Sequence, residues 1–254
     1  MRLTFLGTGT SAGVPYIGCD CEVCRSKDPH DKRLRCSALV ETETTRVLID
    51  CGPDFRQQIL PFEFKPFDGV LLTHIHYDHV GGIDDIRPFC LTRPVDVYTD
   101  EATAKGVRHN FPYCFAEHLY PGVPHLSLHV VTPHVPIHIG DLDIIPFVVM
   151  HGKMPILAFR IGKLAYITDM KTIDEDELPY LEGTETLVVN ALRKEKPHHS
   201  HQLLDDAVNF ARRVGARQTF FIHCTHKMGL HDEVNAHLPE GMQLAYDGQV
   251  VEIG

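Results

Sequence analysis

The feature that most constrains the fold of this sequence is a His-x-His-x-Asp-His pattern that follows a short apolar run at residues 70–72. The pattern places His74, His76, Asp78 and His79 within six residues. Side chains alternate in an extended chain, so the first two imidazoles project to the same side and can bind one ion. The chain then turns at two glycines, which directs the aspartate and the last histidine towards a second ion. A histidine-rich surface loop is the alternative, but the preceding strand and the following glycines favour a two-metal hydrolytic site.

Three further metal-type residues stand later in the chain, and each directly follows an apolar run typical of a strand. They are His151, Asp169 and His223. Taken alone, a histidine or aspartate at a strand end is more often a hydrogen-bonded structural residue than a ligand. The ordered set changes this interpretation, because strands that end at one edge of a sheet bring distant residues together there. The ligand types are compatible with zinc and with manganese, so they do not fix the metal.

The order of these motifs resembles the metallo-β-lactamase superfamily. Residues 6–15 are similar to the glycine-rich opening of its tRNA 3′-processing nuclease and cyclic phosphodiesterase branches, and residues 47–52 to the second strand of the fold. The resemblance implies an α/β fold, a metallo-β-lactamase αββα sandwich with two mixed sheets and helices on the outer faces. It also implies the following ligand sets: His74, His76 and His151 for one ion, Asp78, His79 and His223 for the other, and Asp169 for both. We expect Asp50 to orient a ligand histidine.

A second metal pattern near the start has the form Cys-x-Cys-x-x-Cys, made by Cys19, Cys21 and Cys24. Structural zinc is normally tetrahedral, so three thiolates require a fourth ligand. His226 is the first candidate, because it lies three residues beyond the last catalytic ligand, and Cys36 is the second. The arrangement resembles the bacterial phosphoribosyl cyclic phosphodiesterases of phosphonate breakdown, which implies a structural zinc. Reduced free cysteines or a disulfide are the alternatives.

The composition is compatible with one large domain. The chain has 254 residues, 43% of them hydrophobic, and no linker-like tract or block of charge divides it. We expect a single metallo-β-lactamase-like domain over residues 1–254, with a small zinc loop at 18–26. The 8 cysteines and the lack of a signal-peptide pattern predict a reduced, cytoplasmic protein. No apolar run reaches the length of about 18 residues that crosses a bilayer, so no membrane partner is expected.

Strand-like runs are expected at residues 3–6, 37–41, 46–50, 70–73, 95–98, 126–131, 142–149, 157–161, 164–168, 186–189, 219–222 and 249–253. Helical patterns fall between several of them. The clearest follows Ser200, a good N-cap, and ends at Gly215. Its apolar residues recur at helical spacing and are Leu204, Ala207, Ala211 and Val214.

Net charge restricts the class of partner. The formal net charge of −10 disfavours long nucleic acid, because phosphate-rich partners favour basic surfaces. Bound metal ions reverse that sign locally, so the expected partner is a small anionic phosphodiester. The aromatic and proline-rich residues 111–125 are predicted to cap the site or to form a subunit contact, with core packing as the alternative. This segment and the family resemblance favour a homodimer.

A histidine-rich stretch at residues 196–201 precedes the last ligand strand. By its position relative to His223, His201 matches the histidine that the cyclic phosphodiesterases place against the substrate phosphate. The resemblance therefore implies that it protonates the leaving oxygen, with His198 as the second choice. Its expected place at a helix N-terminus also favours an anion. The alternative is that all the histidines of this stretch are solvated loop residues.

These features predict a hydrolase that uses two divalent ions, zinc or manganese, and one structural zinc, and that acts on a small or cyclic phosphodiester. We expect His201, Asp78 and Asp169 to be catalytic, with Asp169 setting the spacing of the ions. Three alternatives stay open. They are a tRNA 3′-processing nuclease, a hydrolase of thioesters or lactones on the same scaffold, and a non-catalytic metal-binding or redox module. The complete ligand set disfavours the last of these.

Overall fold

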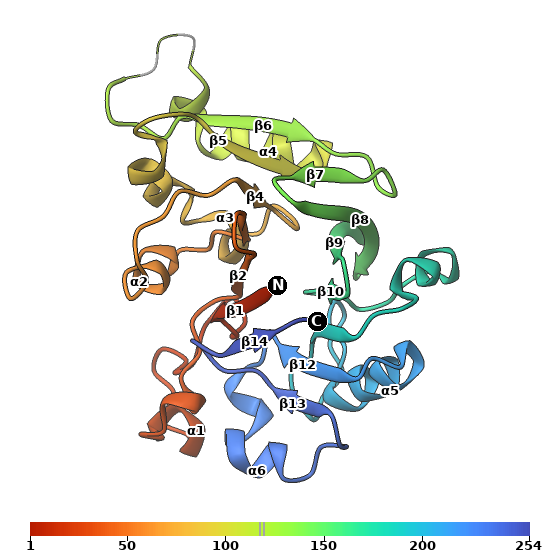
Figure 1. Cartoon of the computed structure of the whole chain (residues 1–254). Coiled ribbons are helices and arrows are strands. Elements are labelled where there is room, and N and C mark those ends of the chain that lie inside the picture. The colour runs from red at the N-terminus through yellow and green to blue at the C-terminus, as the bar shows by residue number, and fades with distance from the viewer. Residues whose placement is uncertain (117, 119) are drawn as a thin grey trace.

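The strands form two mixed sheets that pack face to face (Figure 1). The structure, a computed structural model, describes residues 1–116, 118 and 120–254. The first sheet has the strand order β14-β1-β2-β3-β4-β5-β6 and the second the order β13-β12-β11-β10-β9-β8-β7. The strands of the first sheet are β1 (Arg2–Gly7), β2 (Ser37–Glu41), β3 (Arg46–Ile49), β4 (Gly69–Leu71), β5 (Val95–Thr99), β6 (Leu126–Val130) and β14 (Val250–Glu252). Those of the second are β7 (Ile137–Ile139), β8 (Leu142–His151), β9 (Met154–Ile161), β10 (Leu164–Tyr166), β11 (Thr186–Asn190), β12 (Gln218–Ile222) and β13 (Met242–Leu244).

Both sheets follow the same pattern of strand pairing. In the first sheet, three antiparallel pairs counted from β14 are followed by three parallel pairs. In the second, three antiparallel pairs counted from β7 are again followed by three parallel pairs. The first and last strands, β1 and β14, pair with each other, so the two ends of the chain lie close together in the middle of Figure 1. The carboxyl ends of parallel strands are the usual position for sites in sheets of this kind.

Helices cover the outer faces of the two sheets. The α-helices are α1 (Glu22–Arg25), α2 (Phe55–Ile59), α3 (Tyr77–Val80), α4 (Glu101–Asn110), α5 (Leu204–Val214) and α6 (His231–Asn235). The 3-10 helices are η1 (Pro29–Asp31), η2 (Ile83–Cys90), η3 (Pro112–Phe115), η4 (Glu175–Leu181) and η5 (His226–Met228).

Three hydrophobic clusters connect these layers. One lies between the sheets and takes residues from both, including Phe5 and Phe220. A second joins the first sheet to α2, η2 and α4, and a third joins the second sheet to α5. Strand β3 shows how alternation builds the layers, because Val47 and Ile49 belong to the central cluster and Leu48 to the outer one. The predicted sandwich with outer helices is therefore confirmed.

All the predicted strand positions contain a strand, but two strands were not predicted. Strands β7 and β13 each have only three residues, Ile137–Ile139 and Met242–Leu244. Such short runs lack a distinctive period, and their pairing with β8 and β12 forms them.

The start of the predicted C-terminal helix was wrong. Helix α5 begins at Leu204 with Leu203 as its N-cap, and not after Ser200. The side chain of Asp206 accepts a hydrogen bond from the Leu203 backbone N–H at 3.1 Å, which fixes the later start. Gly215 ends the helix in a left-handed conformation, as predicted. The residues before Leu203 therefore form a loop, so His201 does not stand at the helix N-terminus.

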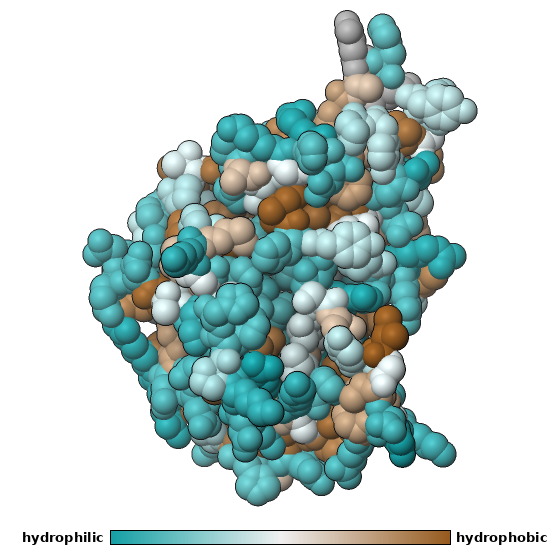
Figure 2. Space-filling view, turned by 180° about the vertical axis from the view of Figure 1, so that it is seen from behind, coloured by the Kyte–Doolittle hydropathy of each residue, from teal (hydrophilic) through white to brown (hydrophobic). Residues whose placement is uncertain are grey.

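The surface seen in Figure 2 is mainly hydrophilic, with apolar side chains in scattered patches. Within the residues that the structure describes, no helix has the length and apolar character needed to cross a membrane.

Candidate metal centre

The predicted ligands gather where the parallel strands of both sheets end. Strand β4 leads into His74, β10 into Asp169 and β12 into His223. His151 is the last residue of β8. Segments that are far apart in the sequence therefore meet at one edge of the sandwich, as the sequence predicted.

The second half of the His-x-His-x-Asp-His pattern lies on a short helix. His76 is the N-cap of α3, and Asp78 and His79 are buried on it. The sequence predicted a turn at this point, and the turn takes the form of this helix, which ends at Gly81.

Three residues at this edge have a left-handed backbone conformation that is uncommon outside glycine. The φ angles are 60° at Asp50, 55° at Asp169 and 57° at His223. Such angles cost energy and persist where the surrounding structure enforces them, which is typical of functional sites. Each of these residues turns the chain sharply at or just beyond a strand end.

One predicted ligand set is assembled around a common point. The ligand atoms of Asp78, His79 and His223 all lie within 4.8 Å of one another. Asp78 Oδ2 is 3.4 Å from His79 Nε2 and 3.5 Å from His223 Nε2. These are the three residues that the family resemblance assigns to one ion.

Asp169 faces both predicted sets. Its Oδ2 lies 3.2 Å from His79 Nε2, and its Oδ1 lies 3.1 Å from His223 Nε2. Asp169 also belongs to two further groups whose ligand atoms lie within 4.8 Å of one another. One of them contains His74 and the other contains His151. This central position is the one predicted for a bridging carboxylate.

The other predicted set is more open. The ring centroids of His74 and His76 are 4.6 Å apart, those of His76 and His151 5.1 Å, and those of His74 and His151 5.6 Å. His74 is buried and His76 is exposed. The structure thus brings the three rings together, with His76 on the solvent side.

The arrangement fits divalent ions. Among the described residues, the Nε2 atoms of His74, His79 and His223 are buried without a hydrogen-bond partner, which is costly unless another group binds them. Two ligands of a tetrahedral zinc ion with bonds of about 2.0–2.1 Å lie roughly 3.3–3.4 Å apart. The nitrogen-to-oxygen distances of 3.1–3.5 Å around Asp78 and Asp169 match that spacing.

The electrostatics of the centre also favour a cation. Burial lowers the pKa of His74 well below its usual value, so this imidazole is neutral, as a metal ligand must be. Burial also acts to lower the pKa of His79, but the charges of Asp50, Asp169 and Asp78 outweigh it and raise that pKa well above its usual value. Three carboxylates therefore create a strong preference for positive charge at His79.

Asp50 lies behind both ligand sets. Its Oδ2 is 2.6 Å from His79 Nδ1, so it orients this histidine directly, as the sequence predicted. The Thr73 hydroxyl donates to the same carboxylate at 2.9 Å and lies 3.0 Å from His74 Nδ1. A His74 Nδ1–H can donate to this hydroxyl. Asp50 thus orients two ligand histidines. Because it engages their Nδ1 atoms, directly or through Thr73, the Nε2 atoms are left free to bind the ions.

We expect Asp50→Asn to lower the metal affinity of the centre about 10- to 100-fold, because the neutral amide no longer strengthens the two ligand histidines. Competition with a chromophoric chelator measures this affinity. Asp96→Asn is the matched control, because Asp96 pairs with His129 at 2.7 Å on the exposed surface. Equal affinity in the two variants would contradict the role assigned to Asp50.

His201 is buried next to the centre. Its Nδ1 lies 3.7 Å from Asp169 Oδ1, and its ring centroid is 4.7 Å from that of His151 and 4.9 Å from that of His223. Burial, with a contribution from the neighbouring His223, lowers the pKa of His201 to about 2. The imidazole is therefore neutral near pH 7 and carries one N–H that it can donate. His198 stacks on His201 at 4.9 Å, whereas His199 is exposed.

A polar pocket, which we call the substrate pocket, opens beside His201 and has a volume of about 270 Å³. Among the described residues, its wall contains two cationic ones, Arg193 and Lys227, and no acidic one, in a chain whose net charge is −10. The residues that line it include Thr10, Ser11, Tyr16, Arg193, His198, His201, His226 and Lys227. The pocket is therefore suited to a small anionic ligand next to the metal centre.

The glycine-rich opening forms part of that wall and packs against the strand end that carries His223. Thr10 N donates to Cys224 O at 3.3 Å, and Cys224 N donates to Thr8 O at 3.1 Å. A Cβ atom at Gly9 would lie 2.9 Å from Arg33 Cβ, so a larger residue cannot approach this closely.

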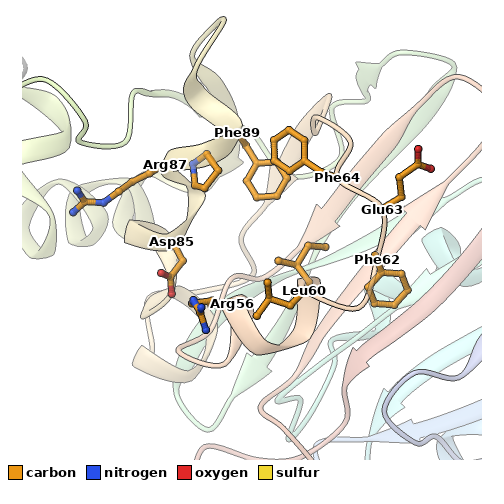
Figure 3. A pocket seen from close by; sticks show the side chains of 10 residues that line it. Arg56, Leu60, Phe62, Glu63, Phe64, Asp85, Arg87 and Phe89 are labelled. Atoms are coloured by element: carbon orange, nitrogen blue, oxygen red, sulfur yellow. The ribbon is translucent and has the colours of Figure 1, made fainter.

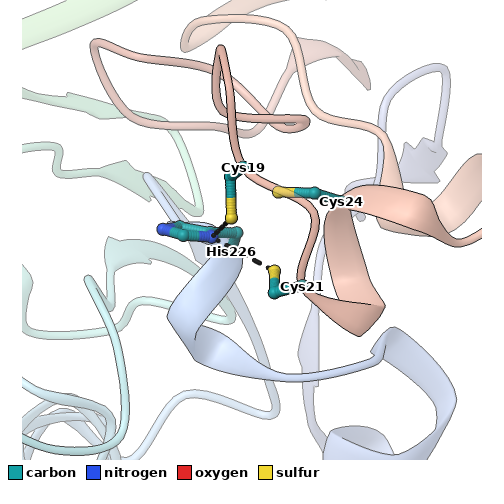
Figure 4. A group of neighbouring side chains, drawn as sticks. All are labelled: Cys19, Cys21, Cys24 and His226. Carbon is teal, nitrogen blue, oxygen red and sulfur yellow. Dashed lines mark hydrogen bonds between the residues drawn. The ribbon is translucent and has the colours of Figure 1, made fainter.

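The cysteine cluster is assembled as predicted in space (Figure 4). The ligand atoms of Cys19, Cys21, Cys24 and His226 all lie within 4.8 Å of one another. His226 Nδ1 is 3.2 Å from Cys19 Sγ and 3.3 Å from Cys21 Sγ. The Cys24 backbone N–H, helped by His226 and opposed by burial, lowers the pKa of the Cys21 thiol to about 6. A thiolate is the form that binds zinc.

Cys36, the second candidate for the fourth ligand, does not lie at this cluster. It is fully buried between the two sheets, in the central hydrophobic cluster. The sequence alone does not show that this cysteine points into the core. All eight cysteines, each of them in a described part of the chain, are free, so the disulfide alternative is not realised.

A separate apolar pocket of about 420 Å³ lies between α2 and η2 (Figure 3). Leu60, Phe62, Phe64 and Phe89 line it, and the rings of Phe64 and Phe89 stack at 4.9 Å. Its wall contains none of the predicted ligands. This pocket is therefore distinct from the metal centre.

The predicted cap at residues 111–125 is only partly described. Tyr113, on η3, donates from its hydroxyl to Asp84 Oδ1 at 2.9 Å, which ties the segment to η2. Residues 117 and 119, which belong to the predicted cap, lie outside the described residues. The dimer contact predicted here stays a prediction.

Several site residues were not found from the sequence. Thr73 directly precedes a ligand histidine and could have been recognised from that position. Tyr16, Arg193 and Lys227 carry no pattern of their own, and only the folded chain brings them to one pocket.

Comparison with known proteins places these features in context. The model of the beta-lactamase superfamily domain matches residues 45–224, a range that contains the seven predicted ligands but neither His226 nor the cysteine loop. A curated protein of Porphyromonas gingivalis named octanoyltransferase is 44% identical over 249 residues, 98% of this chain and 51% of that protein. The chain thus spans about half the length of that relative.

Two solved structures align with nearly the whole of this chain. A protein described as a new diphosphatase from the PhnP family aligns with a TM-score of 0.91 and 41% identity, over 99% of this chain and 97% of that chain. Zinc-bound PqqB from Methylobacterium extorquens aligns over 100% of both chains with a TM-score of 0.81 and 18% identity, which shows a shared fold.

Proposed function

This chain belongs to the beta-lactamase superfamily and, within it, to the PhnP family, and from that premise we propose that it is a dinuclear metal-dependent phosphodiesterase. Its substrate is a small or cyclic phosphodiester. The active site holds two divalent ions, zinc or manganese, and a structural zinc occupies the cluster of three cysteines and His226. The enzyme forms a homodimer. Neither long nucleic acid nor a membrane is among its partners.

The observation that carries the proposal is the set of buried, unpartnered imidazole nitrogens around Asp169. Such a set is stable where cations replace the missing hydrogen-bond partners. A small pocket with Arg193 and Lys227 in its wall opens beside His201, whose Nδ1 lies 3.7 Å from Asp169 Oδ1. The related protein of the PhnP family is described as a diphosphatase, which supports a phosphorus-containing substrate.

In the mechanism, two divalent ions, when bound, supply an activated water and stabilise charge on the phosphoryl oxygens. Asp169 holds the two ligand sets at a fixed spacing, and Asp78 completes one of them. His201 donates a hydrogen bond from its neutral imidazole N–H to the leaving oxygen, on the pocket side of the centre, and this oxygen takes its proton from water. Arg193 and Lys227 hold the negative charge of the substrate.

A second candidate is hydrolysis of an acyl thioester. The name of the Porphyromonas gingivalis relative supports it, because that name describes an acyl-group reaction, but this chain spans about half of that protein. The cationic wall of the substrate pocket favours the phosphodiester instead.

The test is hydrolysis of bis(p-nitrophenyl) phosphate and of an octanoyl thioester by the same metal-loaded preparation. We expect turnover of the diester, abolished by a chelator and restored by zinc or manganese. Turnover of the thioester alone would replace the proposal by the second candidate, and turnover of neither would favour the non-catalytic alternative.

We expect His201→Leu, which removes the N–H donor, to lower kcat about 10²- to 10³-fold for a diester with an alkyl leaving group. The loss is much smaller for a p-nitrophenyl leaving group, because that oxygen departs without help from a donor. Steady-state kinetics on the two substrates measure the difference. His199→Leu is the control, since His199 is an exposed neighbour. An equal loss on both substrates would show that His201 does not assist the leaving group.

A further inference from the structure

Tyr16 is an aromatic residue in the wall of the substrate pocket that the proposed reaction does not use. It follows the glycine-rich opening and is 49% exposed. Its surroundings hold it in place in two ways.

The first is a stacking contact. The rings of Tyr16 and His226 lie nearly parallel, at an angle of 15° and a centroid distance of 5.5 Å. The second is a backbone contact, because Tyr16 N donates to Cys24 Sγ at 3.3 Å. Both partners belong to the cysteine cluster, so this cluster determines where the ring stands.

One side of the ring is thus covered by His226, and the exposed remainder contributes to the pocket wall. A flat aromatic surface of this kind attracts a planar ring through stacking, with little dependence on the polar groups of that ring. A side chain held in advance loses little conformational freedom when the ligand binds.

The neighbours of Tyr16 favour an anionic group on the same ligand. Arg193 donates from Nε to Lys196 O at 2.9 Å, which anchors its guanidinium in the wall without an acidic partner. Lys227 is exposed, and among the described residues it forms no ion pair. A ligand that joins a planar ring to a phosphate therefore matches both parts of the wall.

We propose that Tyr16 is a specificity-determining residue, whose ring stacks on a planar aromatic group in the non-reacting part of the substrate, such as a nucleobase. The inference rests on the proposed phosphodiesterase function and narrows its substrate to nucleotide-like diesters. It also gives the cysteine cluster a role in the reaction, because the cluster positions the stacking surface.

The test compares two cyclic substrates that differ only in the ring. They are adenosine 2′,3′-cyclic phosphate and methyl ribofuranoside 2,3-cyclic phosphate, assayed with wild-type enzyme, Tyr16→Leu, Tyr16→Phe and Tyr16→Trp. We expect Tyr16→Leu to raise KM for the adenosine substrate about 5- to 150-fold and to leave KM for the methyl riboside unchanged. Tyr16→Phe and Tyr16→Trp retain a ring and are expected to stay within about two-fold of the wild type.

A binding measurement makes the result independent of turnover. Calorimetry with adenosine 3′-monophosphate and with ribose 3-phosphate gives the contribution of the base to affinity in each variant. We expect Tyr16→Leu to lose most of the difference between these two ligands, with unchanged zinc content. Equal wild-type affinity for both ligands, or an equal loss of both in Tyr16→Leu, would overturn the proposal. Failure of the wild type to hydrolyse any diester would instead contradict the proposed function.

Discussion

Replacing Asp169 by asparagine is expected to lower kcat/KM for a phosphodiester by at least about 10³-fold. Each carboxylate oxygen of Asp169 faces a different ligand histidine, His223 at 3.1 Å and His79 at 3.2 Å. An amide presents only one oxygen and no charge, so it cannot serve both ions. The shape of the side chain is unchanged, so the loss reports on the metal centre and not on packing.

The control for this change is Asp176→Asn, because Asp176 is an exposed aspartate. Activity is measured beside metal content and thermal unfolding for both variants. A folded Asp169→Asn variant with wild-type activity would show that Asp169 does not bridge two ions.

Replacing Cys24 by serine is expected to remove one zinc ion per chain and to lower Tm by at least about 5 °C. The loop at 18–26 has little other support, since its hydrophobic cluster contains only Val14, Val23 and Cys24 as buried members. Helix α1 has four residues, too few to be stable alone. On this account a bound zinc ion would supply most of the stability that holds this loop against His226.

Metal analysis, thermal unfolding and limited proteolysis check this expectation, with cleavage expected after Arg25 or Lys27 in the variant. Cys90→Ser is the matched control, because Cys90 is half-buried outside the cluster and donates only to Ile86 O. Unchanged zinc content and Tm in Cys24→Ser would instead favour the interpretation that these cysteines are free and bind no metal.

The sequence predicted those parts of the site that depend on local pattern. The spacing of His74, His76, Asp78 and His79 and the apolar runs before Asp169 indicated which residues meet, because strand ends share a sheet edge. The family resemblance implied the sandwich, and the same runs agreed with it. His226 was the first candidate for the fourth ligand because of its place three residues beyond His223 and the family resemblance, and the structure brings it to the cysteine loop.

Other parts could not be predicted, because they depend on packing between distant segments. Helix α5 begins at Leu204 and not after Ser200, because the Asp206 side chain accepts a hydrogen bond from the Leu203 backbone N–H. His201 therefore lies in a loop. Its depressed pKa follows from burial that the sequence does not reveal. Cys36 and His226 were both possible fourth ligands until the sheet showed that Cys36 points into the core. The substrate pocket is lined by residues from three regions of the chain, so no single motif predicts it.

The most direct test of the central claim is metal analysis of protein purified without added metal, together with hydrolysis of bis(p-nitrophenyl) phosphate by the same sample. The account predicts about three metal ions per chain, two in the active site and one at the cysteines, with diesterase activity. About one ion per chain, bound by the cysteines and without activity even after zinc or manganese is added, would contradict it.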